Sequence, residues 1–159
     1  MIERYFQAEK TAGQAVLSIG ILLAAIGGSM LLKAAAPFYT GMALPFLVIG
    51  ILQIMVGATL TRRSDLQALD LAQLQQESPD EFHEQETARI TRVMQNFTRI
   101  KWVEIGLLLI GGWAIWANTV ANFPKGLGVG LCIQALIMLI FDFFAEKRSK
   151  AYRTFVLQP

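Results

Sequence analysis

The sequence has few of the residues that most often carry chemistry. It contains one cysteine, Cys132, and one histidine, His83, among 159 residues. A lone thiol excludes a disulfide within the chain, and protein metal sites need several clustered ligands. There is no Ser–His pair, no phosphate-binding loop and no HExxH motif. The sequence therefore predicts a protein that is not an enzyme and that holds no cofactor or metal.

Charged residues are also scarce. They make up 16% of the chain, against about 25% in soluble domains, whereas hydrophobic residues reach 54%. The apolar excess comes from four long runs, over residues 12–32, 38–60, 103–121 and 126–145. Each run is close to the ~20 residues that a helix needs to cross a bilayer, and none alternates with period two. These runs predict an all-α, four-helix transmembrane bundle made of two hairpins.

Basic residues are distributed unevenly around the four runs. Twelve of the fourteen Lys and Arg residues precede the first run, separate the second from the third, or follow the fourth. Lys33 and Lys125 fall in the other two connections. Because Lys and Arg favour cytoplasmic flanks, we expect both termini and the central segment to be cytoplasmic.

The central segment, residues 62–101, is rich in helix formers and predicts a helical hairpin that stands out of the membrane as a stalk. Ser78, Pro79 and Glu81 fit a capping box, which places the turn beside Pro79. No breaker follows before the third run, so the second stalk helix should continue into it. We therefore expect residues 1–159 to form a single membrane domain with this hairpin inserted.

The two apolar hairpins resemble each other at an offset of 85 residues. Three pairs correspond: Phe38 with Phe123, Gly41 with Gly126, and Gly27 with Gly112. This similarity is consistent with a parallel internal repeat and equally with chance likeness of short apolar hairpins. Small residues at packing spacing, such as Gly20, Ala24 and Gly28, favour close helix contacts.

Polar residues within the runs are the candidates for function, because charges at membrane depth are costly. Glu104 and Asp142 lie near the expected cytoplasmic boundary, where basic residues gather. We expect an interfacial ring of ion pairs there, formed by Arg62, Arg63, Lys101, Glu104, Asp142 and Lys147. The alternative is that Asp142 acts as a transport acid. The uncharged candidates are Gln53, Gln134 and Asn118, as buried hydrogen-bonding groups or contacts to a partner.

Three stretches carry a resemblance to a known group of proteins: "FYTGMALPFLVIGILQIMVGATLTRRSD", "VMQNFTRIKWVEIG" and "KGLGVGLCIQALIMLIFDFFAEKRSKAY". These stretches cover about half of the chain, and in them the chain resembles small four-span inner-membrane proteins of Gram-negative bacteria. In size and topology it is also similar to membrane immunity proteins that protect cells from pore-forming toxins. The resemblance implies a multi-pass protein of the bacterial inner membrane.

These observations leave three functional interpretations. The first is a non-enzymatic protein that binds another protein, in particular an immunity protein against a membrane-acting toxin. The second is a small transporter or channel subunit that works as a homo-oligomer, with Asp142 and Glu104 lining a path. The third is a scaffold or accessory subunit of a membrane complex that uses the acidic tip of the stalk. The expected partners are membrane lipid and a protein, and not nucleic acid.

Overall fold

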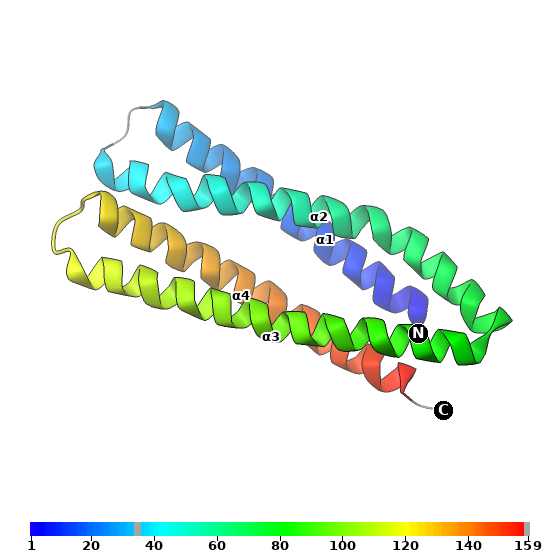
Figure 1. Ribbon diagram of the computed structural model, residues 1–159. Helices are drawn as coiled ribbons and strands as arrows, with labels where there is room; N and C mark the ends of the chain where they lie inside the picture. The colour runs from blue at the N-terminus through cyan, green and yellow to red at the C-terminus, as the bar shows by residue number, and fades with distance from the viewer. Residues whose placement is uncertain (34–35, 158–159) are drawn as a thin grey trace.

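Four long α-helices build the molecule (Figure 1). The computed structural model describes residues 1–33 and 36–157. The helices are α1 (Ile2–Leu32), α2 (Pro37–Glu77), α3 (Pro79–Ala117) and α4 (Phe123–Val156). The α1–α2 and α3–α4 connections lie at one end of the molecule, and the α2–α3 turn lies with both termini at the other. The all-α prediction is confirmed.

The tip of the molecule is a sharp turn at Ser78. Helix α2 ends at Glu77 and α3 begins at Pro79, with Ser78 as its N-cap. The Ser78 side chain makes no capping hydrogen bond, so the expected capping box does not form. Proline fits the first helical position because its missing N–H would have no helical partner there. Beyond the turn α3 is continuous to Ala117, as the lack of breakers predicted.

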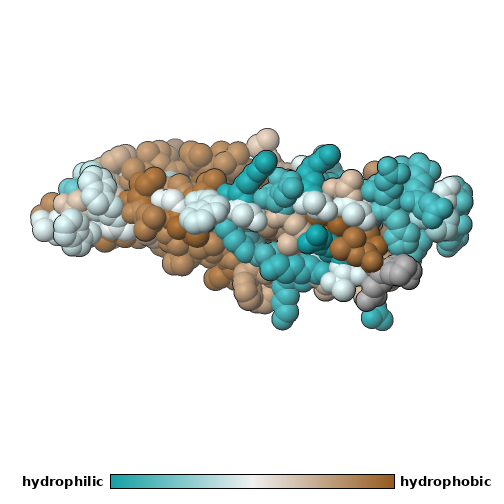
Figure 2. Space-filling model, turned by 60° about the horizontal axis from the view of Figure 1, so that its bottom comes forward, coloured by the Kyte–Doolittle hydropathy of each residue, from teal (hydrophilic) through white to brown (hydrophobic). Residues whose placement is uncertain are grey.

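The molecule divides into an apolar half and a hydrophilic half (Figure 2). All four helices are long and apolar enough to cross a membrane. One expected boundary is wrong: α3 ends at Ala117, so residues 118–121 belong to the connection and not to the third span. Asn122 caps the next helix by accepting a hydrogen bond from the Lys125 amide at 3.2 Å.

Glycines bring the helices of each hairpin into backbone contact. A Cβ added to Gly20 would lie 2.7 Å from the Gly50 carbonyl oxygen, and one added to Gly57 would lie 2.6 Å from that of Gly13. Such spacing leaves no room for a side chain, so glycine sets how closely α1 approaches α2. Gly28, which the sequence grouped with Gly20, instead faces open space.

The two hairpins meet through reciprocal contacts between α2 and α4. A Cβ on Gly41 would strike the carbonyl oxygen of Phe123, and one on Gly126 would strike that of Phe38. These four residues are the two pairs matched at the offset of 85, and a two-fold relation between the hairpins produces such an exchange. The third matched pair, Gly27 with Gly112, is wrong by one residue. Gly27 packs against α2, but the glycine of α3 that packs against α4 is Gly111 and not Gly112.

The hydrophilic half is a bundle in its own right. We call it the distal bundle and define it as residues 2–11, 62–101 and 146–156. Its buried core draws on α1, α3 and α4 and consists of Ile2, Tyr5, Phe6, Phe82, Ile90, Tyr152 and Val156. The expected stalk was a two-helix hairpin, residues 62–101. The structure corrects this, because the first turns of α1 and the last turns of α4 pack onto the hairpin and complete its core.

Candidate functional site

The two deep amides lie between the hairpins and bind each other. Gln53 Nε2 donates to Gln134 Oε1 at 3.1 Å, and the two residues are 2% and 0% exposed. Gln134 Nε2 reaches the Pro45 carbonyl oxygen at 3.5 Å. The amides thus join α2 to α4 inside the bundle. Since neither is accessible, they do not form a surface for a partner helix.

Asn118 occupies a different place from the one expected. It follows the last residue of α3, is half-buried, and donates from Nδ2 to the Ala114 carbonyl oxygen at 2.8 Å. Its Oδ1 accepts from Asn122 Nδ2 at 3.0 Å. Asn118 therefore lies beyond the end of α3, in the connection to the next helix, and not within a span.

Ion pairs form near the middle of the molecule, but with acids that the sequence did not single out. Lys101 pairs with Glu146, and Arg63 Nη2 lies 3.1 Å from Glu9 Oε1. Arg62 and Lys147 are exposed and make no ion pair with any residue that the structure describes. The predicted ring is therefore broken. Glu104 and Asp142 were expected to pair with these bases. Glu9 and Glu146 pair with them instead.

Glu104 and Asp142 form no ion pair with any residue that the structure describes. Glu104 is 3% exposed. Among the described residues, neither of its carboxylate oxygens finds a hydrogen-bond partner, and the same holds for Asp142 Oδ2. The two acids lie on α3 and α4, each about one turn from a member of the Lys101–Glu146 pair and on the same side of it along the bundle. The prediction that they belong to a set of ion pairs is wrong.

A cavity of about 250 Å³ lies between all four helices where the distal bundle joins the apolar half. Asp142 forms part of its wall, together with the paired residues Glu9 and Arg63 and with Arg148. Apolar side chains make up most of the remaining lining, including Val16 of α1. One of the two unpartnered carboxyl groups therefore borders an internal space.

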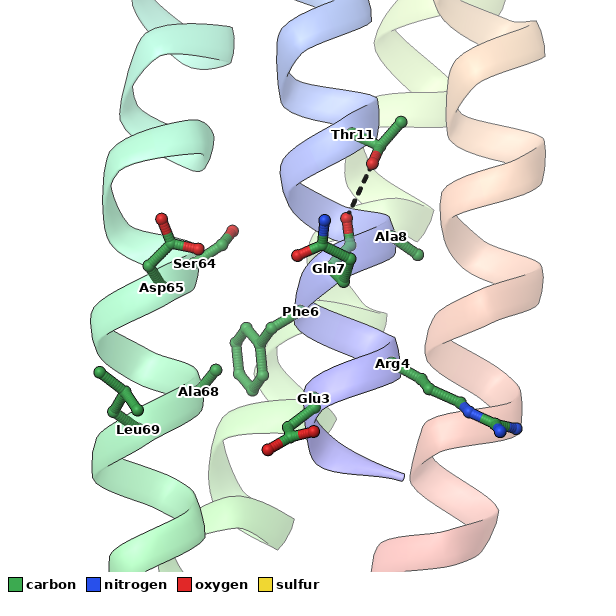
Figure 3. A pocket seen from close by; sticks show the side chains of 10 residues that line it. All are labelled: Glu3, Arg4, Phe6, Gln7, Ala8, Thr11, Ser64, Asp65, Ala68 and Leu69. Carbon is green, nitrogen blue, oxygen red and sulfur yellow. Dashed lines mark hydrogen bonds between the residues drawn. The ribbon is translucent and has the colours of Figure 1, made fainter.

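A second, larger hollow is an open groove of about 760 Å³ on the outside of the distal bundle, between α1 and α2 (Figure 3). Phe6 points from α1 towards α2 and forms its floor. Leu69 lines the α2 side and is 70% exposed, and Leu66, one turn earlier on α2, is 65% exposed. Glu3 and Asp65 border the same groove. It combines an apolar strip with acidic edges.

A buried polar cluster holds the distal bundle together. Glu86, with 1% of its side chain exposed, forms two hydrogen bonds with Arg89, at 2.7 and 2.6 Å. The Arg89 guanidinium lies over the Tyr5 and Phe6 rings, 5.8 and 5.2 Å from their centroids. Burial raises the pKa of the Tyr152 phenol, and the negative charge of Glu86 adds to this effect. The cluster stabilises the fold and presents no reactive group.

Some of these residues were missed from the sequence. Ile2, Tyr5 and Phe6 have helical spacing, and so do Tyr152, Phe155 and Val156. Each stripe is too short to attract notice beside a long apolar run. His83, in the acidic tip, is half-buried, and its Nδ1 lies 3.0 Å from the Val156 carbonyl oxygen.

Comparisons with protein-family models, curated proteins and solved structures found no match to this chain. The candidate sites therefore rest on the chain's own geometry. They are the groove on the distal bundle and the unpartnered carboxyl pair.

Proposed function

We propose that this chain is a non-enzymatic membrane protein that works by binding another protein, and that the partner docks in the groove between α1 and α2. One observation carries the proposal. Leu69 lines a groove of about 760 Å³ and is 70% exposed, and Leu66, which does not line the groove, is 65% exposed three residues earlier on α2. These leucines lie outside the four apolar runs, where lipid does not cover them. Exposed apolar surface there is unfavourable by about 25 cal/mol per Å², and a docked partner would remove that penalty.

The leading form of this function is immunity against a membrane-acting toxin in the bacterial inner membrane. The resemblance in size and topology supports it. The distribution of Lys and Arg supports a groove on the cytoplasmic side. The groove runs along the distal bundle as far as Thr11 and Ser64, at the border with the apolar half, so it would hold the inner end of a membrane-inserted partner. A toxin that acts within the membrane can be blocked there by packing, without catalysis.

Matched leucine substitutions test the proposal. The double variant L66E/L69E changes the groove, and L157E changes a leucine that is 52% exposed at the end of α4. Each tagged chain is extracted from native membranes in mild detergent, and bound proteins are identified by mass spectrometry. A partner is then expressed with each variant to measure cell survival. We expect a stoichiometric partner whose toxicity the wild type and L157E suppress and L66E/L69E does not. Elution without a partner, as a defined homo-oligomer, would contradict the proposal.

A second candidate is a small transporter or channel subunit. The absence of partners for Glu104 and Asp142 among the described residues favours it. Against it, Gly41 and Gly126 hold α2 and α4 in backbone contact farther along the bundle, and the buried Gln53–Gln134 pair joins the same two helices between that contact and Asp142. Under this interpretation Asp142→Asn would abolish flux into proteoliposomes, whereas under the first it would leave partner binding intact.

A further inference from the structure

We propose that Glu104 of α3 and Asp142 of α4 form a proton-binding site in which two carboxyl groups hold one proton between them. The cavity at Asp142 connects this site to the hydrophilic half of the molecule. The inference depends on the geometry of these two residues and holds whichever partner the groove binds.

Burial without a partner sets Glu104 apart from other acids of the chain. Glu86 is buried to a similar degree, but Arg89 satisfies both of its oxygens. Glu146 is paired with Lys101 and Lys150. Glu104 is 3% exposed, and both of its oxygens are buried with no partner among the described residues. A buried carboxylate in this state is strongly unfavourable, and protonation removes its charge.

A second carboxyl group at the same level of the bundle allows the two acids to share one proton. Two carboxylates in contact cannot both remain charged at low energetic cost, so the pair retains a proton as a unit. Here the second group is Asp142, whose buried Oδ2 is also without a partner in the described part of the chain. Lys101 of α3 pairs with Glu146 of α4. Glu104 and Asp142 each lie about one turn from these paired residues, in the same direction along the bundle, so the two acids share one level of neighbouring helices.

The surrounding charges do not neutralise both acids. The charge of Lys101 on α3 acts on Glu104 and on Asp142, but Lys101 is itself paired with Glu146 of α4. From α1 and α2, Glu9 and Arg63 line the same cavity as Asp142 and pair with each other. Arg148 of α4 lines the cavity six residues from Asp142, about 9 Å along the helix. Lys101 and Arg63 are each held by another acid and Arg148 lies farther along its helix, so no base forms an ion pair with Glu104 or Asp142 among the residues that the structure describes.

The ligand is a proton and not a metal ion. Calcium takes six to eight oxygen ligands and magnesium needs near-octahedral coordination. Among the residues that the structure describes, no three Asp, Glu, His or Cys side chains gather in a way that could hold a metal. The ammonium group of Lys101 also acts on the site and opposes a second cation. A proton needs only one oxygen lone pair.

The cavity gives this site access from one direction. Its volume of about 250 Å³ has room for several water molecules, each occupying about 30 Å³ of liquid. Towards the other end of α4 lie Gln134, bonded to Gln53, and then Gly126, in backbone contact with Phe38. Protons would therefore enter and leave through the cavity, on the side of the distal bundle.

Labelling with dicyclohexylcarbodiimide tests the proposal on the native chain. This apolar reagent adds to protonated carboxyl groups in apolar surroundings, and peptide mapping by mass spectrometry locates the adduct. The purified protein in detergent is labelled over a pH series, with sodium or potassium chloride added or omitted. Glu86 serves as an internal control, because it is equally buried but fully paired with Arg89.

We expect an adduct on Glu104 or Asp142 at neutral pH that declines several-fold as the pH rises and does not respond to either salt. Glu86 should stay unlabelled throughout. Suppression of the adduct by sodium or potassium at constant ionic strength would identify a metal-ion site and overturn the proposal. Absence of an adduct on both residues at every pH, or labelling of Glu86 to the same extent, would overturn it as well. E104Q and D142N should each lower the total labelling, and the mapped wild type decides the question if either variant does not fold.

Discussion

The ring of Tyr5 stacks on the ring of Tyr152, with centroids 4.1 Å apart and planes inclined by 12°. The Tyr5 hydroxyl also lies 3.3 Å from Ser149 Oγ. This contact joins the second turn of α1 to the end of α4, so the two termini share one core. The distal bundle therefore depends on segments that flank the apolar runs as much as on the hairpin between them.

Tyr152→Ala should destabilise the distal bundle by about 3–5 kcal/mol, because it removes a buried aromatic side chain and its stacking on the Tyr5 ring. Tyr39→Ala is the matched control, since Tyr39 is 48% exposed at the other end of the molecule. Thermal unfolding in detergent, followed by circular dichroism, measures both. Equal melting temperatures for the two variants would show that the cluster does not stabilise the fold.

Arg89→Met should lower the free energy of unfolding by about 3 kcal/mol, because it leaves Glu86 charged and buried without its partner. The double variant E86L/R89M removes both charges and should recover most of that loss. Chemical unfolding of the three proteins gives the comparison. If the double variant is as unstable as Arg89→Met, the loss comes from the guanidinium's contacts with the Tyr5 and Phe6 rings and not from the unpaired charge of Glu86.

Gly20→Ala should weaken the α1–α2 contact by about 1–3 kcal/mol, because the added Cβ would meet backbone atoms of α2 at 2.7–2.9 Å. Gly28→Ala, on the same helix, should have little effect, since nothing lies within 4 Å of its added Cβ. The melting temperature in detergent or the resistance to limited proteolysis distinguishes the two. A similar loss in both variants would show that close approach of α1 to α2 does not explain the effect at Gly20, because nothing approaches Gly28 and alanine favours the helix at both positions.

Gln134→Leu should cost about 1–2 kcal/mol, because Gln53 is left buried without its acceptor. The double variant Q53L/Q134L should lose less than the sum of the two single variants. A double-mutant cycle on unfolding free energies measures this coupling. Strict additivity would indicate that the amides do not bind each other in the membrane.

The four apolar helices and the turn at Ser78 were predictable, because hydropathy and proline act locally. Twenty apolar residues need a membrane or a core wherever they occur, and Pro79 can start a helix but not continue one. The continuity of α3 to Ala117 followed from the same local argument.

The pairing of charges was not predictable, because it depends on how helices rotate against one another. Lys101 and Glu104 are three residues apart on α3, yet Lys101 pairs with Glu146 while Glu104 is buried and finds no partner in the described part of the chain. The sequence gives the level of each charge along its helix, and the rotation that selects a partner comes from tertiary packing. The same limit concealed the approach of Tyr5 to Tyr152, which are 147 positions apart.

The stacking of Tyr5 on Tyr152 also imposes an order on biosynthesis. A growing chain presents the first hairpin to the membrane long before Tyr152 has been made. Contacts between residues so distant in sequence form late, and an N-terminal segment awaiting its partner exposes apolar surface meanwhile. Ile2 and Phe6 therefore lack their α4 neighbours, Tyr152 and Val156, through most of translation. The distal bundle is complete only once the last turns of α4 have left the ribosome.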